Sequence, residues 1–317
     1  MRAAAPGAYA GRIDRSHLTS ARARSGTYSI VARDATSGEL GVAVQSHWFS
    51  VGPIVPWTRA GVGAVATQAN AEISYGPEAL ELLQSGLDAQ AALARLVAQD
   101  AQAASRQVAV VDSNGTIAVH TGDSCLSHAG HLTAAGVSCQ ANVMASPRVW
   151  PAMVAAFESA PGPLTMRLLA ALDAAEGEGG DLRGRQSAAL LVVPARGSEW
   201  DSVVSLRVED HPDPLVELRR LVRLDEAYKI AGEADQRAGE GRHDQAAELY
   251  QRASRLAPES EELLFWSGLG VAAVGDLDTG VRQVQAAIAV RPGWRELLSR
   301  LSPEVAPGAA AVLGRLS

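Results

Sequence analysis

Residues 26–44 read GTYSIVARDATSGELGVAV and hold the pattern that decides the fold. Two runs of β-forming residues, Tyr28–Ala32 and Leu40–Val44, lie on either side of a turn rich in Asp, Thr, Ser and Gly. Such a pair of runs predicts a β-hairpin. Thr27 stands directly before the first run, with Gly26 in front of it. A glycine and a threonine therefore open the first predicted strand.

The chain continues with strands that are joined by turns and alternate with helical segments. Further strands are predicted at Gly61–Thr67, Gln107–Val111, Thr116–His120, Val137–Val143, Ala188–Val193 and Val203–Val208. Asn114-Gly115, between two of these strands, is the strongest short signal for a hairpin. Helices are predicted after Pro77 and Asp88 and over residues 147–159 and 164–175. Hairpins in place of βαβ crossovers favour antiparallel sheets covered by helices, which is an α+β fold.

The last third of the chain shows only helical periodicity and contains a repeat. Pro258 and Pro292 lie 34 positions apart, and Gly241 and Gly275 keep the same spacing. A 34-residue period with small residues at packing positions is typical of tetratricopeptide (TPR) repeats. Two repeats with flanking helices at Leu215–Lys229 and Trp294–Leu301 predict a small all-α domain over residues 211–317.

Composition excludes several classes of partner. The 317 residues contain 28 Lys and Arg against 35 Asp and Glu, a net charge of −7, and no basic stripe that would predict nucleic-acid binding. No apolar run reaches the roughly 18 residues of a membrane span. Two cysteines indicate a reducing compartment, so a cytoplasmic location is expected. Residues 1–26 lack the apolar block of a secretory signal and are predicted to be a disordered tail or a propeptide.

Thr27 is the strongest candidate for a catalytic residue. If the chain begins at Thr27, the hydroxyl can act as nucleophile and the α-amine of the same residue as base. The unperturbed pKa of such an amine is about 7.7–8.0, so much of it can accept a proton near neutral pH. This arrangement needs no Ser-His-Asp triad, and neither a G-x-S-x-G nor an H-E-x-x-H motif occurs in the sequence. On the dipeptide alone, however, Thr27 could simply be a β-forming residue.

A series of separated motifs resembles an uncharacterised bacterial family, the domain-of-unknown-function family numbered one thousand and twenty-eight, grouped with the N-terminal nucleophile (Ntn) hydrolases. The motifs are Thr27–Asp34, Gly38–Val44, Gly52–Trp57, Gly61–Ala69, Ser74–Pro77, His120–Gly122, Gln140–Met144 and Gly180–Ala188. The resemblance implies a four-layer αββα sandwich over residues 27–210 and an amide hydrolase acting through an acyl-enzyme on Thr27. It also implies that a homodimer is to be expected.

In similar proteins the threonine often follows the initiator methionine directly, whereas here 26 residues precede it. Three explanations stay open: cleavage between Gly26 and Thr27, a later start of translation, or an uncleaved and inactive protein. The first two leave the same free amine on Thr27.

Other site residues are predicted from their places near strand ends. Asn142 shares a strand face with Gln140, since positions two apart lie on one side, and is the candidate oxyanion donor. Ser46 and Gln68 end two strands and could line the same pocket. The candidates where a glycine-rich loop enters a strand are Arg185, Gln186 and Ser187. The alternative for that loop is that Asp181 and Arg183 form a surface ion pair that merely stiffens it.

Two alternatives to an Ntn hydrolase remain. The first is a non-catalytic adaptor that grips a protein partner with the TPR-like helices. The second is a zinc hydrolase that would use the following cluster: His120, Cys125, His128, His131 and Cys139. Their spacing matches no established zinc pattern, so no metal and no other cofactor is expected. The expected substrate is a small amide or a peptide-like molecule.

Overall fold

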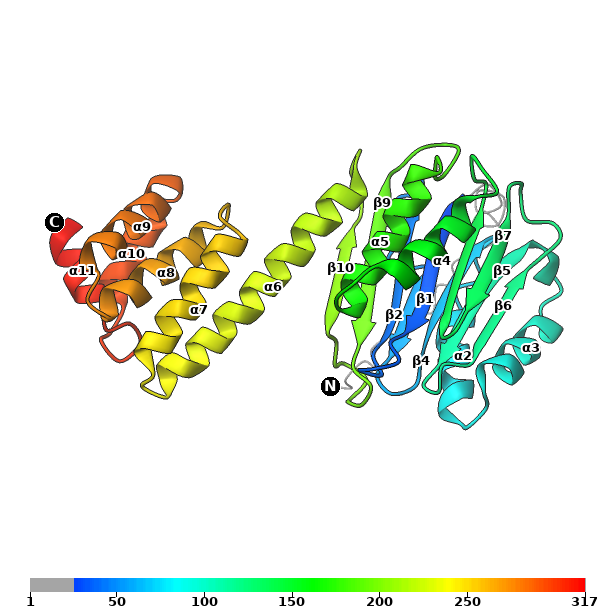
Figure 1. Ribbon diagram of the computed structural model, residues 1–317, viewed down its shortest axis with the longest axis horizontal. Helices are drawn as coiled ribbons and strands as arrows, with labels where there is room; N and C mark the ends of the chain where they lie inside the picture. Colours follow the sequence, from blue (N-terminus) through cyan, green and yellow to red (C-terminus); the bar gives the residue numbers. More distant parts are fainter. Residues whose placement is uncertain (1–25, 317) are drawn as a thin grey trace, which may run out of the picture. The chain divides into compact units, whose positions relative to one another are not determined.

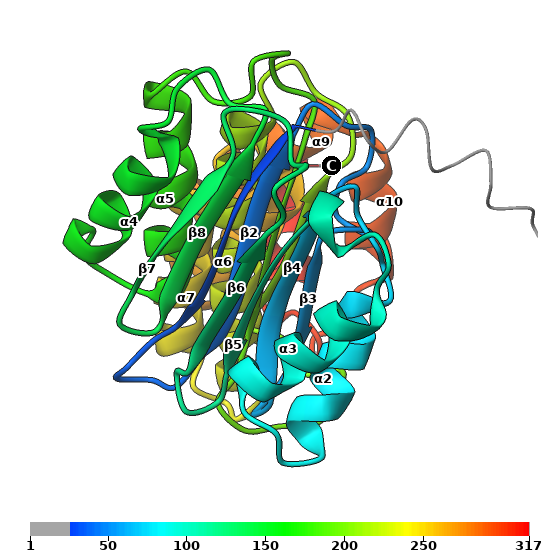
Figure 2. The same ribbon diagram turned by 90° about the vertical axis from the view of Figure 1, so that its right-hand side faces the viewer.

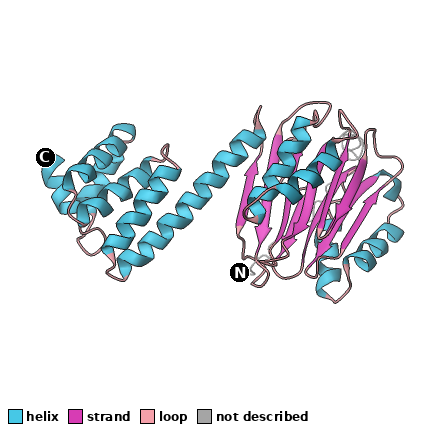
Figure 3. Ribbon diagram, in the orientation of Figure 1, coloured by secondary structure: helices cyan, strands magenta, loops and turns pink. Residues whose placement is uncertain are grey.

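The computed structural model describes residues 26–316. These residues form two compact units, the first ending at Leu218 and the second beginning at Arg219. Among the described residues, strands occur only in the first unit and the second unit is entirely helical (Figure 3). The predicted α+β region and the all-helical C-terminal region are therefore confirmed. The predicted tail or propeptide lies outside the described residues, apart from Gly26.

The first unit contains two antiparallel sheets (Figure 1). The first sheet has the order β10-β9-β2-β1-β8-β7. Its strands in chain order are β1 (Thr27–Arg33), β2 (Leu40–Ser46), β7 (Gly130–Ala134), β8 (Val137–Asn142), β9 (Ser187–Val193) and β10 (Val204–Val208). The second sheet, in the order of its pairing, consists of β3 (Pro56–Arg59), β4 (Gly63–Ala69), β5 (Arg106–Asp112) and β6 (Ile117–Thr121). The hairpin predicted at residues 26–44 is the β1–β2 pair.

Two strands escaped prediction from the sequence. The four-residue strand β3 begins with Pro56, whose ring removes a backbone donor and confines it to a strand start or an edge. Strand β7 lies at the edge of the first sheet, and three of its five residues are exposed. Neither strand therefore carries the alternating apolar pattern of a half-buried strand.

The two sheets face each other, and helices cover their outer faces (Figure 2). On the first sheet, α4 (Val149–Ser159) packs against β7 and β8, and α5 (Leu164–Gly177) against β1 and β2. On the second sheet, α2 (Tyr75–Gln84) packs against β4 and α3 (Ala89–Gln99) against β6. A short 3₁₀ turn, η2 (Ala103–Ser105), leads into β5. Each sheet therefore has one face toward helices and one face toward the other sheet.

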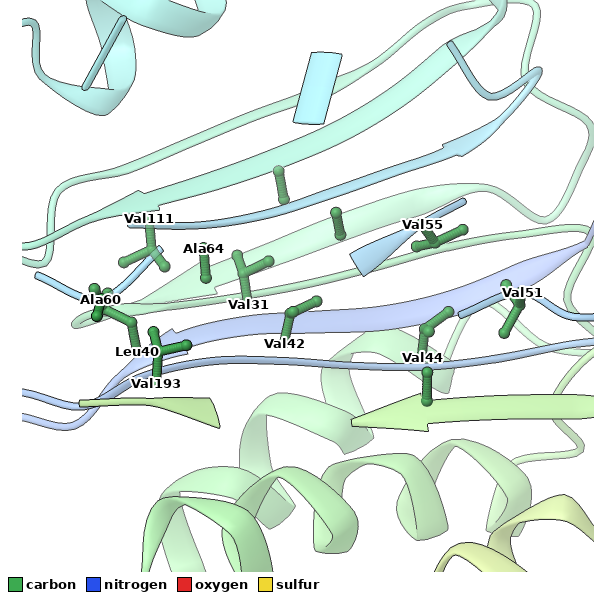
Figure 4. Close-up of a cluster of buried hydrophobic side chains, with 13 residues drawn as sticks. Val31, Leu40, Val42, Val44, Val51, Val55, Ala60, Ala64, Val111 and Val193 are labelled. Carbon is green, nitrogen blue, oxygen red and sulfur yellow. The ribbon is translucent and has the colours of Figure 1, made fainter. Parts of the chain in front are cut away.

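An apolar core fills much of the space between the sheets (Figure 4). The first sheet contributes Val31, Leu40, Val42 and Val44, all fully buried. The second sheet contributes Ala64, Ala66, Ala109 and Val111, which are also fully buried. The second sheet thus presents mainly small side chains to the larger ones of the first. This core fixes the register of β1 and β2, because a slip by one residue would turn the valines toward α5.

The second unit is built from packed helices. They are the end of α6 (Pro214–Gly239), α7 (His243–Leu256), α8 (Glu261–Ala273), α9 (Leu277–Val290), α10 (Gly293–Arg300) and α11 (Ala309–Leu316). Gly241 and Gly275 join α6 to α7 and α8 to α9, with φ of 75° and 104°. Such positive φ values favour glycine in both turns. The 34-residue spacing in the sequence therefore reflects two helical pairs with the same kind of turn.

Candidate functional site

Thr27 is the first residue of β1 and lies between β2 and β8. It is paired with Ser46 on one side and Asn142 on the other. Because side chains alternate along a strand, Thr27, Ser29 and Val31 point toward the second sheet, whereas Tyr28 points toward α5. Two contacts agree with this direction: Ser29 bonds Gln68 on β4, and the Tyr28 hydroxyl donates to Glu176 on α5. The Thr27 side chain is buried between the sheets, with Thr27 2% exposed.

The hydroxyl groups of Thr27 and Ser46 form a short chain that ends on the preceding peptide bond. Ser46 Oγ donates to the carbonyl oxygen of Gly26 at 2.5 Å. Thr27 Oγ1 lies 3.0 Å from Ser46 Oγ. Because the single proton of Ser46 is directed to Gly26, the Thr27 hydroxyl is the donor in its contact with Ser46. The nucleophile candidate and the Gly26–Thr27 carbonyl are thus linked through one serine.

A partly buried ion pair holds the same carbonyl from another side. Arg183 Nη2 donates to the Gly26 oxygen at 2.9 Å and to Asp181 Oδ2 at 2.7 Å. The Asp181 side chain is completely buried. The two residues do form an ion pair, but its carboxylate is buried and only the arginine is partly exposed. Their loop folds back over the start of β1, which spacing along the chain does not reveal.

Near Thr27, buried amide side chains form a hydrogen-bonded network between the two sheets. Gln107 on β5 accepts through Oε1 from Gln68 at 2.8 Å and from Asn142 at 2.9 Å. Gln140 donates to Ser29 Oγ at 2.6 Å, and Ser29 donates to Gln68 at 2.6 Å. These contacts satisfy groups that would otherwise be costly to bury. The network fixes the side chains that surround the first residues of β1.

Two members of the network also reach the backbone of Thr27. Asn142 Nδ2 lies 3.5 Å from the Thr27 carbonyl oxygen, and Gln68 Nε2 lies 3.4 Å from it. These amides therefore contact the carbonyl of Thr27, whereas Ser46 and Arg183 contact the carbonyl of Gly26. The structure brings together the predicted residues Thr27, Asn142, Gln68 and Ser46. Gln140 belongs to the same network, one step farther from Thr27.

Strained backbone positions lie at or just after the ends of three of the strands that carry these residues. Ala69 follows Gln68 with φ of 65°, and Val143 follows Asn142 with φ of 59°. Ser50, in the segment after β2, has φ of 57°. Positive φ is uncommon outside glycine and an outlier for a β-branched residue such as valine. Strain of this kind is often found where a structure holds functional groups in place.

A small cavity of about 20 Å³ lies beside Thr27, which is room for about one water molecule. Thr27, Ser46 and Gln68 supply its polar lining, and the other lining residues are Trp48, Val51, Ile54, Val55, Ala69 and Ala71. A larger hollow of about 150 Å³ lies beyond Asn142. It is lined by Ala69, Asn70, Ser105, Ser124, Cys125, Leu126, Asn142 and Val143. Ala69 borders both spaces, and none of these residues carries a full charge.

The three candidates at the start of β9 have different surroundings. Ser187 is fully buried, faces Ser46 across the β2–β9 pair and donates to the Trp48 carbonyl at 2.5 Å. It thereby supports the segment that walls the small cavity. Arg185 instead bonds Glu176 at 2.6 Å and Asp213, and Gln186 bonds Asp210 at 3.1 Å. The structure therefore does not bring Arg185 and Gln186 into contact with the network around Thr27.

Sequence reasoning missed two of the residues in this site. The sequence predicts a strand at Gln107, which is confirmed by β5, but no sequence feature indicates that the Gln107 side chain lies at the centre of the network. Arg183 was named only as a partner of Asp181, whereas it contacts the Gly26 carbonyl. The signal that pointed to this loop was its glycine content, which did not distinguish Arg183 from Arg185. Only the folded structure shows that Arg183 contacts the Gly26 carbonyl, whereas Arg185 pairs with acidic side chains outside the network around Thr27.

The cysteine and histidine cluster does not gather around one point. Cys139 is fully buried in β8, where burial raises the pKa of its thiol. His120 bonds the Ala103 carbonyl through Nε2, and His131 bonds Thr121 through Nδ1. Burial also raises the pKa of the Cys125 thiol, which keeps it in the less nucleophilic form. Within residues 26–316, no group of three His, Cys, Asp or Glu side chains could hold a metal ion.

Comparisons with known proteins cover the first unit. The family model of DUF1028, a family of unknown function, matches residues 27–218. The chain is similar to a DUF1028 protein from Silicibacter pomeroyi whose crystal structure is known, with 34% sequence identity. The match covers 62% of this chain and 85% of that protein, and the two structures superpose with a TM-score of 0.57. Anbu, an ancestral β-subunit from Yersinia bercovieri, is 14% identical over 61% of this chain and 91% of its own. Its TM-score of 0.34 is too low to support an argument about the fold.

No curated protein matches the chain. In the described part of the chain, none of the helices has both the length and the apolar character that a membrane span requires. The family model, in contrast, spans more than half of the sequence, from the threonine that opens β1 to the end of the first unit. The chain therefore belongs to the family of unknown function DUF1028.

Proposed function

We propose that the protein is an N-terminal nucleophile hydrolase that cleaves an amide C–N bond through an acyl-enzyme on Thr27. One observation carries the proposal: the buried Thr27 hydroxyl is linked through Ser46 to the carbonyl of the peptide bond just before it. The two facing sheets with helices on their outer faces are, in this proposal, the αββα sandwich of that superfamily. The proposal requires no metal and no organic cofactor.

The first step frees the α-amine of Thr27. Thr27 Oγ1 attacks the carbonyl carbon of Gly26, so that a C–O bond forms. The hydroxyl proton passes to Ser46, and Ser46 passes its own proton to the Gly26 oxygen along the existing hydrogen bonds. Collapse of this intermediate breaks the C–N bond and returns a proton to the nitrogen of Thr27. The product is an ester between Gly26 and Thr27 with a free amine, and water then hydrolyses the ester to a Gly26 carboxylate.

The second step is turnover with an external substrate. The free amine accepts the proton of the Thr27 hydroxyl while Oγ1 attacks the substrate carbonyl, and the proton then passes to the leaving nitrogen. Water attacks the resulting ester, which releases the acid and restores the hydroxyl. The unperturbed pKa of an α-amine is about 7.7–8.0. The rate is therefore expected to rise with pH through that range, because only the neutral amine can act as base.

The amide network has a supporting role in this mechanism. Asn142 and Gln68 both contact the Thr27 carbonyl, so they hold the backbone from which the nucleophile projects. Asn142 also borders the 150 Å³ hollow, and its amide can donate to a bound substrate there by giving up the long 3.5 Å contact with the Thr27 carbonyl. The residues that line that hollow carry no full charge, which favours an uncharged leaving group.

N-terminal sequencing and intact-mass measurement of the purified full-length chain test the proposal. A homogeneous N-terminus at Thr27 is expected for the wild type, because cleavage is intramolecular. Thr27→Ala lacks the nucleophile and should retain the preceding residues, whereas Thr27→Ser should still be cleaved. Thr133→Ala, an exposed threonine on β7, serves as the matched control and should behave as wild type. Cleavage of the Thr27→Ala chain at the same bond would contradict the proposal.

A second candidate function belongs to the helical unit. The regular glycine turns at Gly241 and Gly275 and the 34-residue period support TPR-like pairs, which commonly present a concave face to a peptide. A small hollow of about 30 Å³ beside Tyr250, Trp266 and Leu269 lies within this unit. In this alternative the protein is an adaptor, and Thr27→Ala would leave its biological activity intact.

A further inference from the structure

The ester that self-cleavage produces has the same chemical form as a working acyl-enzyme. In both, a carbonyl carbon is bonded to Thr27 Oγ1, and the difference lies only in the group attached to that carbon. Gly26 is therefore the first acyl group that this site handles, if the proposed function holds. The residues that surround Gly26 consequently describe the surroundings of the substrate's acyl group.

Two donors hold the oxygen of that acyl group. Ser46 Oγ donates at 2.5 Å and Arg183 Nη2 at 2.9 Å. A charged donor to a carbonyl oxygen becomes more favourable as negative charge develops on that oxygen. Ser46, which passes its proton to this oxygen during self-cleavage, and Arg183 are thus placed to stabilise the negative charge that develops on the oxygen while Thr27 attacks, both in self-cleavage and in the later turnover.

The α-carbon of Gly26 faces a carboxylate. A Cβ added to this residue would lie 2.7 Å from both carboxylate oxygens of Asp181 and 2.8 Å from its Cγ. Real Cβ atoms essentially never approach heavy atoms so closely, so one of the two groups would have to move. At the position of the Cβ of an L-residue, the space beside the acyl α-carbon therefore accommodates hydrogen and excludes a methyl group.

Asp181 cannot easily move away. Its Oδ1 accepts from the backbone N–H of Arg183 at 2.9 Å and from Arg183 Nε at 3.1 Å. Its Oδ2 accepts from the backbone N–H of His47 at 3.1 Å and from Arg183 Nη2 at 2.7 Å. Rotation of the side chain would break these four contacts and leave a buried charge without partners, which is strongly unfavourable. The wall beside Gly26 is rigid.

We propose that Ser46, Arg183 and Asp181 form an acyl-group subsite that selects substrates without a substituent on the α-carbon, that is, glycine-like amides. This inference rests on the proposed function and adds the class of substrate to it. Ser46 and Arg183 contact the acyl oxygen, and Asp181 is the specificity-determining residue beside the α-carbon.

Activated esters test this subsite independently of the natural leaving group. The full chain, once its N-terminus is shown to be Thr27, is treated with the p-nitrophenyl esters of N-acetylglycine and N-acetyl-L-alanine. The rate of p-nitrophenol release and the mass of the acylated Thr27 peptide are recorded. One misfitting methyl group in a pocket is worth roughly 10- to 200-fold in rate, so we expect the glycine ester to react faster by a factor in this range.

Two substitutions at one position separate shape from charge. Asp181→Asn keeps the size of the wall and should retain the preference for glycine, whereas Asp181→Ala opens the wall and should bring the two rates close together. Asp244→Ala, an exposed acid on α7, is the control and should leave the ratio unchanged. A merely structural Asp181 would alter both esters equally and leave the ratio where it was.

Self-cleavage supplies a second readout. Gly26→Ala should slow the appearance of the Thr27 N-terminus by roughly tenfold or more, and the added change Asp181→Ala should recover most of the loss. Equal rates for both esters with Thr27-dependent labelling would overturn the subsite and leave the proposed function standing. Failure of both esters to label an N-terminal Thr27 would overturn it as well. A chain that never exposes Thr27 would contradict the proposed function itself and remove this inference with it.

Discussion

The space between the two sheets is filled in two different ways along the length of β1. Toward Arg33, the interface is an apolar core in which Val31, Leu40 and Val111 pack against other hydrophobic side chains. Toward Thr27, the same interface consists of hydroxyl and amide groups, each held by another. A protein selected only for stability would be expected to continue the apolar packing, since buried polar groups bring little net gain. The polar end of the interface is therefore best explained by what it does for Thr27.

The apolar end should dominate the stability of the first unit. Leu40→Ala removes a fully buried side chain from this core and is expected to lower the free energy of unfolding by about 3 kcal/mol, from lost burial and a residual cavity. Hydrogen exchange of the β1 and β2 amides measures this locally, which avoids a contribution from the helical unit. Thr27 should still be exposed by cleavage in the folded fraction.

The same substitution at an exposed leucine is the control for this measurement. Leu132 on β7 is 42% exposed, and Leu132→Ala should change stability by less than about 0.5 kcal/mol. A similar loss of stability at both positions would mean that the interface between the sheets is not the main source of stability.

The two ends of the interface also differ in how far the sequence predicted them. The β-forming run Leu40–Val44 predicts a strand in a hairpin with Tyr28–Ala32, and the β1–β2 pair at the apolar end confirms this hairpin. The polar end depends on which strands are neighbours, and β8 lies beside β1 although more than 100 residues separate them along the chain. Periodicity contains no information on such pairing. The sequence nevertheless predicts Thr27, Asn142 and Gln68 as site residues, because Thr27 opens a strand after a glycine and the other two lie near strand ends.

The loop before β9 shows the opposite outcome. Arg183 and Arg185 are two positions apart in the same glycine-rich loop, and the sequence makes Arg185 the site candidate. Arg185 pairs with Glu176 and Asp213, whereas Arg183 contacts Gly26. The loop bends at Gly184, where φ is 103°, and the direction of that bend decides which arginine faces the site. No rule of strand alternation applies in an irregular loop, so the choice could not be made from the sequence.

At the polar end, Gln107 is expected to matter next most. Gln107→Leu leaves the amide groups of Gln68 and Asn142 without their shared acceptor. Buried donors without partners cost about 1–3 kcal/mol, so we expect a loss of about 2 kcal/mol in the stability of the first unit. Because both amides also contact the Thr27 carbonyl, exposure of the Thr27 N-terminus should slow as well. Urea unfolding followed by hydrogen exchange at β4 and β8 measures the first effect, and intact mass measures the second.

An exposed glutamine provides the matched control. Gln99 lies at the end of α3, and Gln99→Leu should change neither stability nor cleavage. If Gln107→Leu were neutral or stabilising while cleavage continued at the normal rate, the amides would be ordinary packing groups. The contrast between the two ends of the interface would then lose its functional meaning.

The smallest expected effect is on the pH dependence of stability, which should depend on a group at the apolar end of β1 and not on Thr27. Asp34 directly follows the apolar end of β1. The backbone N–H groups of Ser37 and Thr36 donate to its carboxylate and lower the pKa of Asp34, and the nearby Arg167 lowers it further. An unfolded Asp has a pKa of about 3.9, so the unfolded chain binds a proton first as the pH falls. The stabilisation by Asp34 is thus present above that value and lost as the pH drops through the lower folded pKa.

Asp34→Asn should therefore be less stable than wild type at pH 7 and should lose less stability than wild type between about pH 5 and 2. Thermal unfolding across this range measures the difference. The rate of Thr27 acylation in the same variant should still rise near pH 8, because that limb belongs to an α-amine at the other end of the strand. A shift of the alkaline limb in Asp34→Asn would show that the two ends of β1 are coupled. An unchanged alkaline limb of the acylation rate, together with the altered acid limb of stability, would mean that the apolar end supports the fold while the polar end supplies the chemistry.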